Sequence, residues 1–458
     1  MIGEEGLQRA GQVTIEQLKL VSSKNTVIDL TEFLVELHVY EDIFQNHLYG
    51  EILLTDSRNI IDKLNIHGEE FLNIKLKTPS FSDKDVIEKT FRVFKISNRE
   101  IVRDSNTQNF TLHFVSVELF YDILLPLFVS FEGNITDVVS DIFSNYIASS
   151  RNFDIADNEK EIKEKEKVTE LIIINEADNK VKFISPGWSP LRCINWLASK
   201  AIPKEGVAKN FLFFESNKNF YFGTVENLFK DAVENDNYLG KYFIAASNIR
   251  ADESAPDINR ELYIARDVIM TDSTDYIKNY TNGYLANRLV FLDVFNKEYS
   301  LIDYDHTASY ENQFHSSGAG KTSIPVFAKD GFKNPASSIS FYPKNPKLFS
   351  DFTDNINEKM DQIYGNRKSS LLELTNIRMN ITVPGRTDAE IGRLLYFEYP
   401  SLGAKDESDG AIDASDELYS GYYFITSIHH IVTKNEHSMV MEIVKDYLYV
   451  NENSKNKA

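Results

Sequence analysis

The chain has 458 residues and carries 49 lysines and arginines against 69 aspartates and glutamates, so its formal net charge is −20. This balance argues against a nucleic-acid binder held by a basic face. The length predicts about three domains. A hydrophobic content of 42%, with 31 phenylalanines and 23 tyrosines, is typical of a globular protein with an aromatic-rich core.

Cysteine usage and the N-terminal segment bear on the compartment in which the chain folds. Cys193 is the single cysteine, so no internal disulfide can form and no thiol pair is present for a structural zinc site. Residues 1–19 lack the apolar stretch of a signal peptide, and nothing later approaches ~18 uninterrupted apolar residues. We expect a protein that folds in a reducing cytoplasm and does not span a membrane.

Residues 12–118 show the alternation of apolar and polar side chains that is typical of half-buried β-strands. The predicted strands are 33–40, 72–77, 91–96 and 110–114. In the first strand, Phe33, Val35, Leu37 and Val39 are expected on one face. A polar turn at 103–106 would join the last two strands as a hairpin. This pattern predicts a first domain built as an antiparallel sheet or barrel.

Helical spacing appears in residues 119–250, which predicts a second, α+β domain. Asn134 is the expected N-cap of an amphipathic helix over 135–147, and Ser189 with Pro190 marks the start of another. A hairpin is predicted from 211–214 and 220–222. The Lys/Glu run at 157–170 is interpreted as a solvated insertion.

The rest of the chain is predicted to be a mixed region at 251–372, a second β-domain at 373–450 and a polar tail at 451–458. In the mixed region we expect strands 262–270 and 288–293, a turn at Asn282-Gly283, a long surface loop at 306–345 and a helix at 355–372. In the second β-domain we expect strands 377–383 and 394–399, a turn at 383–386, an acidic loop at 403–417 and a closing hairpin over 422–446. The predicted fold class is α+β, mainly β, with two similar antiparallel β-barrel domains flanking the α+β inserts.

The closing hairpin resembles the hairpin that ends the first domain. Four identities stand 330 positions apart, pairing Phe94, Ser97, Ile101 and Val102 with Phe424, Ser427, Ile431 and Val432. Beyond the turn, Phe110, Leu112 and Phe114 match Met439, Met441 and Ile443 if the second turn is one residue shorter. An internal repeat of this kind predicts that three copies in a ring would display six similar sheets and could dock on a sixfold partner.

Several short motifs, taken in order over about residues 12–450, resemble a known family. The N-terminal ones are Tyr40, Glu41, Asp42, Ile43, Phe44, Leu48, Gly50, Asp56, Ser57, Leu64, Ile66, Gly68, Glu69 and Glu70. The central ones are Trp188, Pro190, Trp196, Leu197, the 213–222 hairpin, Asn282, Gly283, Tyr284 and Asn287. The C-terminal ones are Val383, Pro384, Gly385, Gly392, Pro400, Ser420, Gly421, Tyr422, His430, Lys445 and Asp446. Their order resembles the central baseplate hub proteins of T-even-like contractile phage tails, which are related to the hubs of Mu-like phages and the hub part of VgrG.

The resemblance implies a homotrimer whose two tube domains per subunit form a pseudo-sixfold ring in the virion baseplate, assembled in the host cytoplasm. Such a ring adapts a sixfold tail tube to a threefold central spike, and its lumen passes the tape measure protein and then DNA. The implied partners are the spike trimer, tube or tube-initiator proteins and baseplate wedge proteins. An acidic lumen would not trap a polyanion in transit. The 157–170 insertion and the 306–345 loop depart from the short T-even hub.

Candidate catalytic and metal motifs are weak. The run Gly318 to Thr322 ends like a phosphate-binding loop, but position 315, where a glycine is needed, is a histidine. His429 and His430 are adjacent and therefore expected on opposite faces of a strand, without the spacing of metal ligands. We therefore expect no metal and no cofactor.

Other reactive residues are interpreted as structural. Asp56 beside Ser57, and Asp293, are expected to be caps or turn formers rather than catalysts. Cys193 is expected to be buried in the helix that begins at Pro190. Trp188 and Trp196 are expected to be packing residues, with an oligomer interface as the second reading. We therefore predict no catalytic residue and a protein that is not an enzyme.

Two alternative functions remain open at the level of sequence. The first is a tail-associated peptidoglycan hydrolase, because 69 acidic residues offer many carboxylate pairs. The second is the hub of a related injection system of the type VI kind. No spike-like extension follows residue 450, so we expect the spike to be a separate partner.

Overall fold

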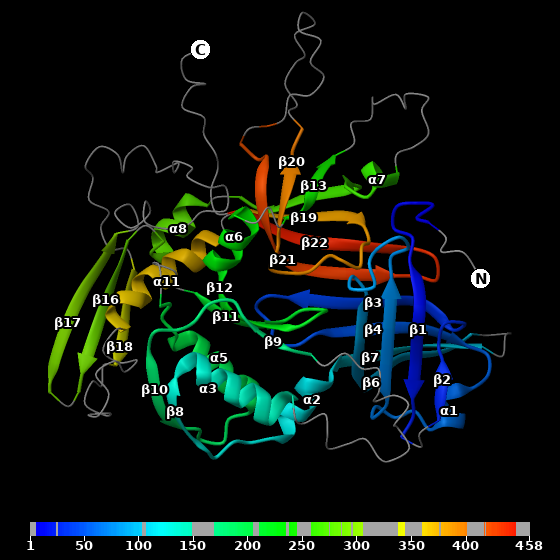
Figure 1. The fold of residues 1–458 in the computed structure, drawn as a ribbon, viewed down its shortest axis with the longest axis horizontal. Helices are drawn as coiled ribbons and strands as arrows, with labels where there is room; N and C mark the ends of the chain where they lie inside the picture. Colours follow the sequence, from blue (N-terminus) through cyan, green and yellow to red (C-terminus); the bar gives the residue numbers. More distant parts are fainter. Residues whose placement is uncertain are drawn as a thin grey trace, which may run out of the picture.

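Strands make up most of the regular structure of this chain, so the mainly β fold class is confirmed (Figure 1). The computed structural model describes residues 6–23, 26–102, 107–148, 169–204, 210–234, 238–244, 258–273, 275–284, 286–294, 296–305, 338–343, 360–374, 377–400, 416 and 418–445. Most of the predicted features at 157–170, 306–345 and 403–417, the Gly318–Thr322 motif and the 451–458 tail lie outside these residues.

Seven N-terminal strands pair in antiparallel fashion in the order β3-β4-β7-β6-β5-β1-β2. They are β1 (Thr14–Val21), β2 (Val27–Asp29), β3 (Leu34–Asp42), β4 (Tyr49–Asp56), β5 (Phe71–Lys77), β6 (Ile87–Val102) and β7 (Thr107–Ser116), with the short helix α1 (Ile60–Leu64) after β4. The predicted alternation holds in β5, where Leu72, Ile74 and Leu76 are buried. It fails at Val35, which is exposed because a bulge between Leu34 and Glu36 shifts the register of β3.

The middle of the chain forms a separate α+β layer with its own core. Its elements are α2 (Val117–Leu124), β8 (Ser130–Asn134), α3 (Ile135–Ile142), a π-helical turn (Phe143–Ala148), β9 (Leu171–Ile173), β10 (Lys180–Ile184), α5 (Pro190–Lys200), β11 (Phe211–Glu215), β12 (Phe220–Thr224) and α6 (Val225–Glu234). Asn134 caps α3 as predicted, because its side chain accepts a hydrogen bond from the Thr136 amide. Ser189 makes no such cap; the Asp122 carboxylate accepts from the Leu191 amide at 2.6 Å instead.

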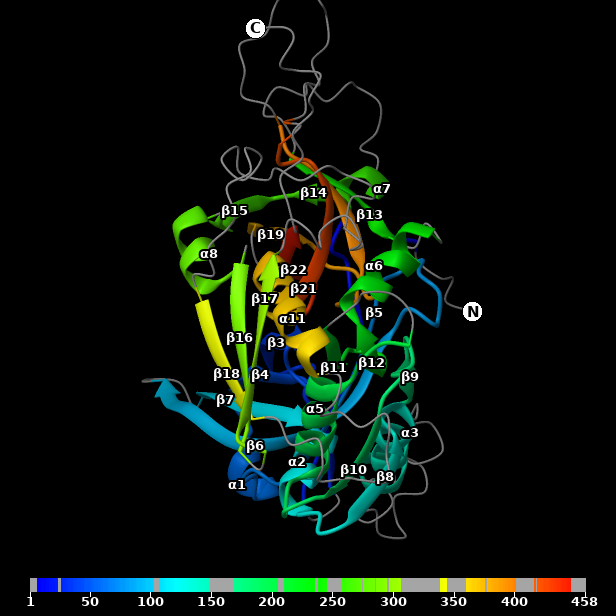
Figure 2. The ribbon, with the colours of Figure 1, turned by 90° about the vertical axis from the view of Figure 1, so that its left-hand side faces the viewer.

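A small three-stranded sheet lies beside the helices α8 (Tyr276–Asn282) and α11 (Met360–Leu374) (Figure 2). Its strands are β16 (Ala286–Asp293), β17 (Glu298–Asp305) and β18 (Ser338–Pro343), in the order β17-β16-β18. The prediction of a continuous loop over 306–345 is wrong at β18, which pairs parallel with β16 over six residue pairs. A strand of only six residues between polar segments is too short for its alternation of apolar and polar side chains to be recognised as a strand.

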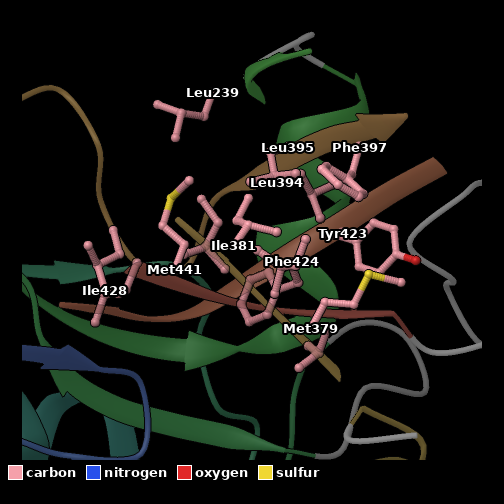
Figure 3. Close-up of a cluster of buried hydrophobic side chains, with 14 of the residues drawn as sticks. Leu239, Met379, Ile381, Leu394, Leu395, Phe397, Tyr423, Phe424, Ile428 and Met441 are labelled. Carbon is pink, nitrogen blue, oxygen red and sulfur yellow. The ribbon is translucent and has the colours of Figure 1, made fainter. Parts of the chain in front are cut away.

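Seven further strands form the C-terminal part of the main sheet. They are β13 (Tyr238–Ile244), β14 (Ile264–Ala265), β15 (Asp267–Asp272), β19 (Ile377–Pro384), β20 (Leu394–Glu398), β21 (Gly421–Val432) and β22 (His437–Lys445), with α7 (Ile258–Glu261) before β14. The strand β13 lies inside the range expected for the α+β domain, yet it pairs with β20. Their apolar side chains form one core, in which Ile381, Phe424 and Met441 lie together (Figure 3).

Both groups of strands belong to a single 14-stranded sheet. Among the described residues no ladder closes either group into a barrel, so the barrel form of the two domains is not confirmed. No helix in the described part of the chain is long and apolar enough to cross a membrane.

Candidate functional site

The same five-strand arrangement occurs twice in the chain. The N-terminal unit has the order β3-β4-β7-β6-β5, and the C-terminal unit has the order β15-β19-β22-β21-β20. The strands β3 and β15, which stand at one end of these orders, are also the first strands of their units along the chain. The last two strands along the chain, β6 and β7 in one unit and β21 and β22 in the other, form an antiparallel hairpin. Identical connectivity over five antiparallel strands supports an internal repeat far more strongly than residue identities do.

The structure corrects the residue correspondence between the two hairpins. Phe110, Leu112 and Phe114 are buried and match Met439, Met441 and Ile443, as predicted. Their partners across the ladder do not stand 330 positions apart: Val93 faces Phe114, and Ile425 faces Ile443. The four identities at that spacing are therefore not structural equivalents.

The physical reason for this correction is the number of bulges. The pairing of β6 with β7 shifts register twice, between Val93 and Lys95 and between Ser97 and Glu100, whereas that of β21 with β22 shifts once. Each bulge adds a residue to one strand without adding a partner. Phe94 is consequently exposed, while Phe424, the residue expected to be equivalent, is fully buried.

The two units join where β3 pairs antiparallel with the second half of β21, and we call this pairing the junction (Figure 1). The ladder runs from Asp42 opposite Ser427 to Leu37 opposite Val432. Leu37 and Val432 are both fully buried in the core of the N-terminal unit. A side chain from the C-terminal unit thus completes the core of the other unit.

The buried face of the junction carries a connected polar network. His430 Nε2 lies 2.8 Å from a Glu41 carboxylate oxygen, and His430 Nδ1 lies 3.0 Å from His437 Nε2. The Asn217 amide, from the β11–β12 turn, donates to the other Glu41 oxygen. Burial and the neighbouring His430 ring lower the pKa of His437 well below its ordinary value. Buried polar groups of this kind specify one arrangement of the packed elements, because any other arrangement leaves them unpaired.

The opposite face of the junction carries a row of aromatic rings. The rings of His429 and Tyr40 stack with 4.2 Å between their centroids, and those of Tyr40 and Tyr49 stack with 4.7 Å between theirs. The row therefore crosses β21, β3 and β4. His38 Nδ1 lies 2.9 Å from His429 Nε2. Burial, with the neighbouring His38 and His430, lowers the pKa of His429 to about 4. His429 and His430 lie on opposite faces, as predicted.

Contacts outside the junction also link the two units to each other and to the α+β layer. Thr78, after β5, and Thr387, after β19, exchange hydrogen bonds in which each backbone amide donates to the other hydroxyl, at 3.1 and 3.0 Å. Lys89 of β6 and Glu215 of β11 form a buried ion pair that links the α+β layer to the main sheet. Glu215 also accepts from the Leu48 amide.

The residues singled out by sequence do not come together at one place. Asp56 accepts from the amides of Arg58 and Ile60 at 2.7 Å, and Asp293 accepts from the Asn296 amide, so both act as the predicted caps or turn formers. Cys193 is buried in α5 as predicted, and burial raises the pKa of its thiol. Trp188 and Trp196 pack against the core of the α+β layer, with 5.7 Å between their ring centroids.

No group of three or more histidine, cysteine, aspartate or glutamate side chains within the described residues is arranged to hold a metal ion. Sequence reasoning missed the Glu41–His430–His437 network, because its members lie far apart in the chain. The signal that could have found it is the presence of three ionisable residues at positions that the strand alternation places on the buried face.

These features define a repeated architecture in which two similar units share one sheet. The chain is similar to the tail protein from Neisseria meningitidis MC58, with a TM-score of 0.50 and 7% sequence identity over 94% of this chain and 96% of that chain. The resemblance to tail proteins drawn from the residues is therefore confirmed at the level of the fold.

Other solved structures were found with lower TM-scores. The 43 kDa tail protein of prophage MuSo2 from Shewanella oneidensis has a TM-score of 0.49 and 10% identity, covering 94% of this chain and 99% of that chain. The Francisella PdpA-VgrG complex has a TM-score of 0.42 and 12% identity, covering 98% of this chain and 60% of that chain. No family model matches the chain, and no curated protein matches it in sequence.

Proposed function

We propose that this chain is the structural hub of a contractile phage-type tail, working as a homotrimer. The observation that carries the proposal is the repeat of β3-β4-β7-β6-β5 as β15-β19-β22-β21-β20 within one continuous sheet. A ring of three such chains presents six similar units, which is the geometry needed to adapt a sixfold tube to a threefold spike. The fold shared with the Neisseria tail protein supports the tail assignment.

In this proposal each unit serves as one tube domain, and the ring encloses a lumen for the tape measure protein and DNA. Its partners are the tube or tube-initiator proteins on one side, the spike trimer on the other and the wedge proteins around it. The net charge of −20 per chain suits passage of DNA without binding. The location is the tail baseplate of the virion.

Native mass measurement of the purified chain tests the oligomeric state, with electron microscopy of the same sample to test the ring. We expect a trimer with pseudo-sixfold projections and a central hole. A chain that stays monomeric at concentrations up to the solubility limit, alone and with its spike partner, contradicts the homotrimeric hub.

We further propose that the hub catalyses nothing. Asp56 and Asp293 are occupied by capping hydrogen bonds, and the Glu41 carboxylate is buried in the junction network. A zymogram on peptidoglycan checks this directly, and we expect no clearing. Lysis that is abolished by a single carboxylate substitution would establish the hydrolase alternative instead.

A further inference from the structure

We propose that the second half of β6 is the docking edge for β15 of a second copy of this chain, with the two strands paired antiparallel. The inference rests on the proposed ring and deepens it, because it names the surface through which one copy recognises the next. It follows from comparing the two units strand by strand.

The junction is the template for this contact. Within one chain the second half of β21 has β22 on one side and β3 on the other. The equivalent strands of the repeat are β6 for β21, β7 for β22 and β15 for β3. A junction made from the equivalent strands would therefore join β6 of one copy to β15 of the next.

Both equivalent edges lack a neighbouring strand in the described part of the chain. Residues 87–92 of β6 pair with β5, whereas residues 96–101 have β7 on one side and no strand ladder on the other. The strand β15 pairs with β19 and with no other strand. Open edges of this kind are templates for pairing with another chain.

The register of the proposed β6–β15 pairing follows from the equivalent buried residues of the two units. Ile52 of β4 lies opposite Leu112 of β7, and in the C-terminal unit Ile381 of β19 lies opposite Met441 of β22. We take these two pairs as equivalent. The residues next to them on the outer strands are Leu37 and Val268, so these two are equivalent.

On the other edge, Ile101 corresponds to Val432. Ile101 faces Gln108 and Val432 faces His437, two positions before Phe110 and Met439 respectively. Since Val432 pairs with Leu37 at the junction, the repeat places Ile101 of one copy opposite Val268 of the next.

The side chains at these positions fit the contact. Val432 is fully buried in the core of the neighbouring unit, whereas Ile101 is 74% exposed in the single chain. Val268 lies at the margin of the C-terminal core, where it is only partly buried. Placing Ile101 against Val268 would complete the C-terminal core as Val432 completes the N-terminal one. It would also remove a large aliphatic side chain from water.

The charges along the two edges are complementary. On β6, Lys95 and Arg99 precede Ile101, and β15 carries Asp267 before Val268 and Asp272 at its end. With Ile101 opposite Val268, antiparallel pairing brings the basic side chains of β6 alongside the half of β15 that ends at Asp272. Opposite charges across strands stabilise such a pairing.

The contact is heterologous, since an edge of one kind meets an edge of another kind. Contacts of this type form rings when the rotation closes and filaments when it does not. The alternation of internal junctions and contacts between copies then gives six similar units in a ring of three chains.

Disulfide cross-linking tests the contact. The double variant Ile101→Cys/Val268→Cys, treated with a mild oxidant, is expected to give covalent dimers and trimers on a denaturing gel without reductant. Each single variant is expected to stay monomeric, and an equal mixture of the two single variants is expected to give dimers only. The exposed pair Glu100→Cys/Ile269→Cys provides a second readout that leaves the core untouched.

Ile101→Asp tests the contribution of the apolar contact, and we expect at least a tenfold weaker association of the native oligomer. The matched control is Val27→Asp, which changes an exposed aliphatic residue on the edge strand β2, outside the contact. Circular dichroism of each variant reports whether it is folded.

The outcomes separate this inference from the proposed function. A trimer that neither cross-links through these pairs nor weakens with Ile101→Asp overturns the β6–β15 contact and leaves the trimeric hub standing. Cross-linking of Ile101→Cys with itself would show a symmetric edge contact and also overturn the proposal. A chain that remains monomeric overturns both.

Discussion

At the scale of single residues, the two neutral histidines of the junction make stability depend on pH. Burial lowers the pKa of His437 well below 6.5 and, with the neighbouring histidines, lowers that of His429 to about 4. The unfolded chain therefore binds protons near pH 6.5 that the folded chain does not bind until the pH is lower. The stabilisation is complete above pH 6.5 and is lost as the pH falls toward 4.

We predict that His429→Gln reduces the pH dependence of stability between pH 7 and pH 4.5. The difference in the free energy of unfolding across this range should shrink by about 1–2 kcal/mol, a value that allows for the partial exposure of the ring. Urea unfolding at both pH values measures it. His67→Gln is the control of opposite sign: hydrogen bonds keep the pKa of that exposed histidine above its ordinary value, so its removal should not shrink the difference. An unchanged slope for His429→Gln would contradict the assignment.

The buried pair of Lys89 and Glu215 gives a second residue-scale prediction. Lys89→Met leaves the Glu215 carboxylate buried without its cation, so we expect a loss of about 3–5 kcal/mol in the free energy of unfolding. The double variant Lys89→Met/Glu215→Gln restores a neutral pair and retains the acceptor for the Leu48 amide. We expect it to be more stable than Lys89→Met in denaturant titration. A double variant that is no more stable than Lys89→Met would contradict the ion pair.

At the scale of elements, β4 depends on a glycine. A Cβ at Gly50 would collide with the His38 carbonyl oxygen on one side and the Phe114 ring on the other. We therefore expect Gly50→Ala to cost about 1–3 kcal/mol through displacement of β3 or Phe114. Thermal unfolding measures this, with Gly6→Ala as the control, because a Cβ there meets nothing nearer than 3.7 Å. Equal melting temperatures for both variants would contradict the close packing of β3 against β4.

Local patterns predicted most strands of the two units, because one face of each is buried and alternation follows burial. Ile377, Met379 and Ile381 were placed correctly on one face of β19 for this reason. Departures from alternation were not predictable. Asn98 adopts a left-handed backbone conformation within β6, where two register shifts occur. The residues around it in the sequence do not predict this conformation.

Elements whose pairing is distant in sequence were the least predictable. The strand β13 is partly buried and pairs parallel with β20, more than 150 positions away. Its few residues carry no signal of that partner, since a parallel ladder needs a long crossover connection. The junction network of Glu41, His430 and His437 was hidden for the same reason, although each residue by itself could be placed on a strand.

At the scale of the whole molecule, the repeat was predicted through the wrong residues. The four identities 330 positions apart suggested it, yet strand order, rather than identity, establishes it. Side-chain identity is lost readily where a bulge moves a residue from one face to the other, as at Phe94 and Phe424. Strand order persists, because changing it requires rebuilding the core.

Hydrogen exchange provides a prediction for the assembled molecule that needs no substitution. Amides of residues 96–101 and of β15 that face away from β7 and β19 have no strand partner in the part of the chain that the structure describes. Pairing between copies would protect them, so we expect their exchange to slow by on the order of tenfold or more as protein concentration rises through the association range. Residues 27–29 of β2, on the far edge of the sheet, should exchange at a constant rate. Protection that appears at β2 and not at β6 and β15 would place the contact between copies on the opposite edge of the N-terminal strands.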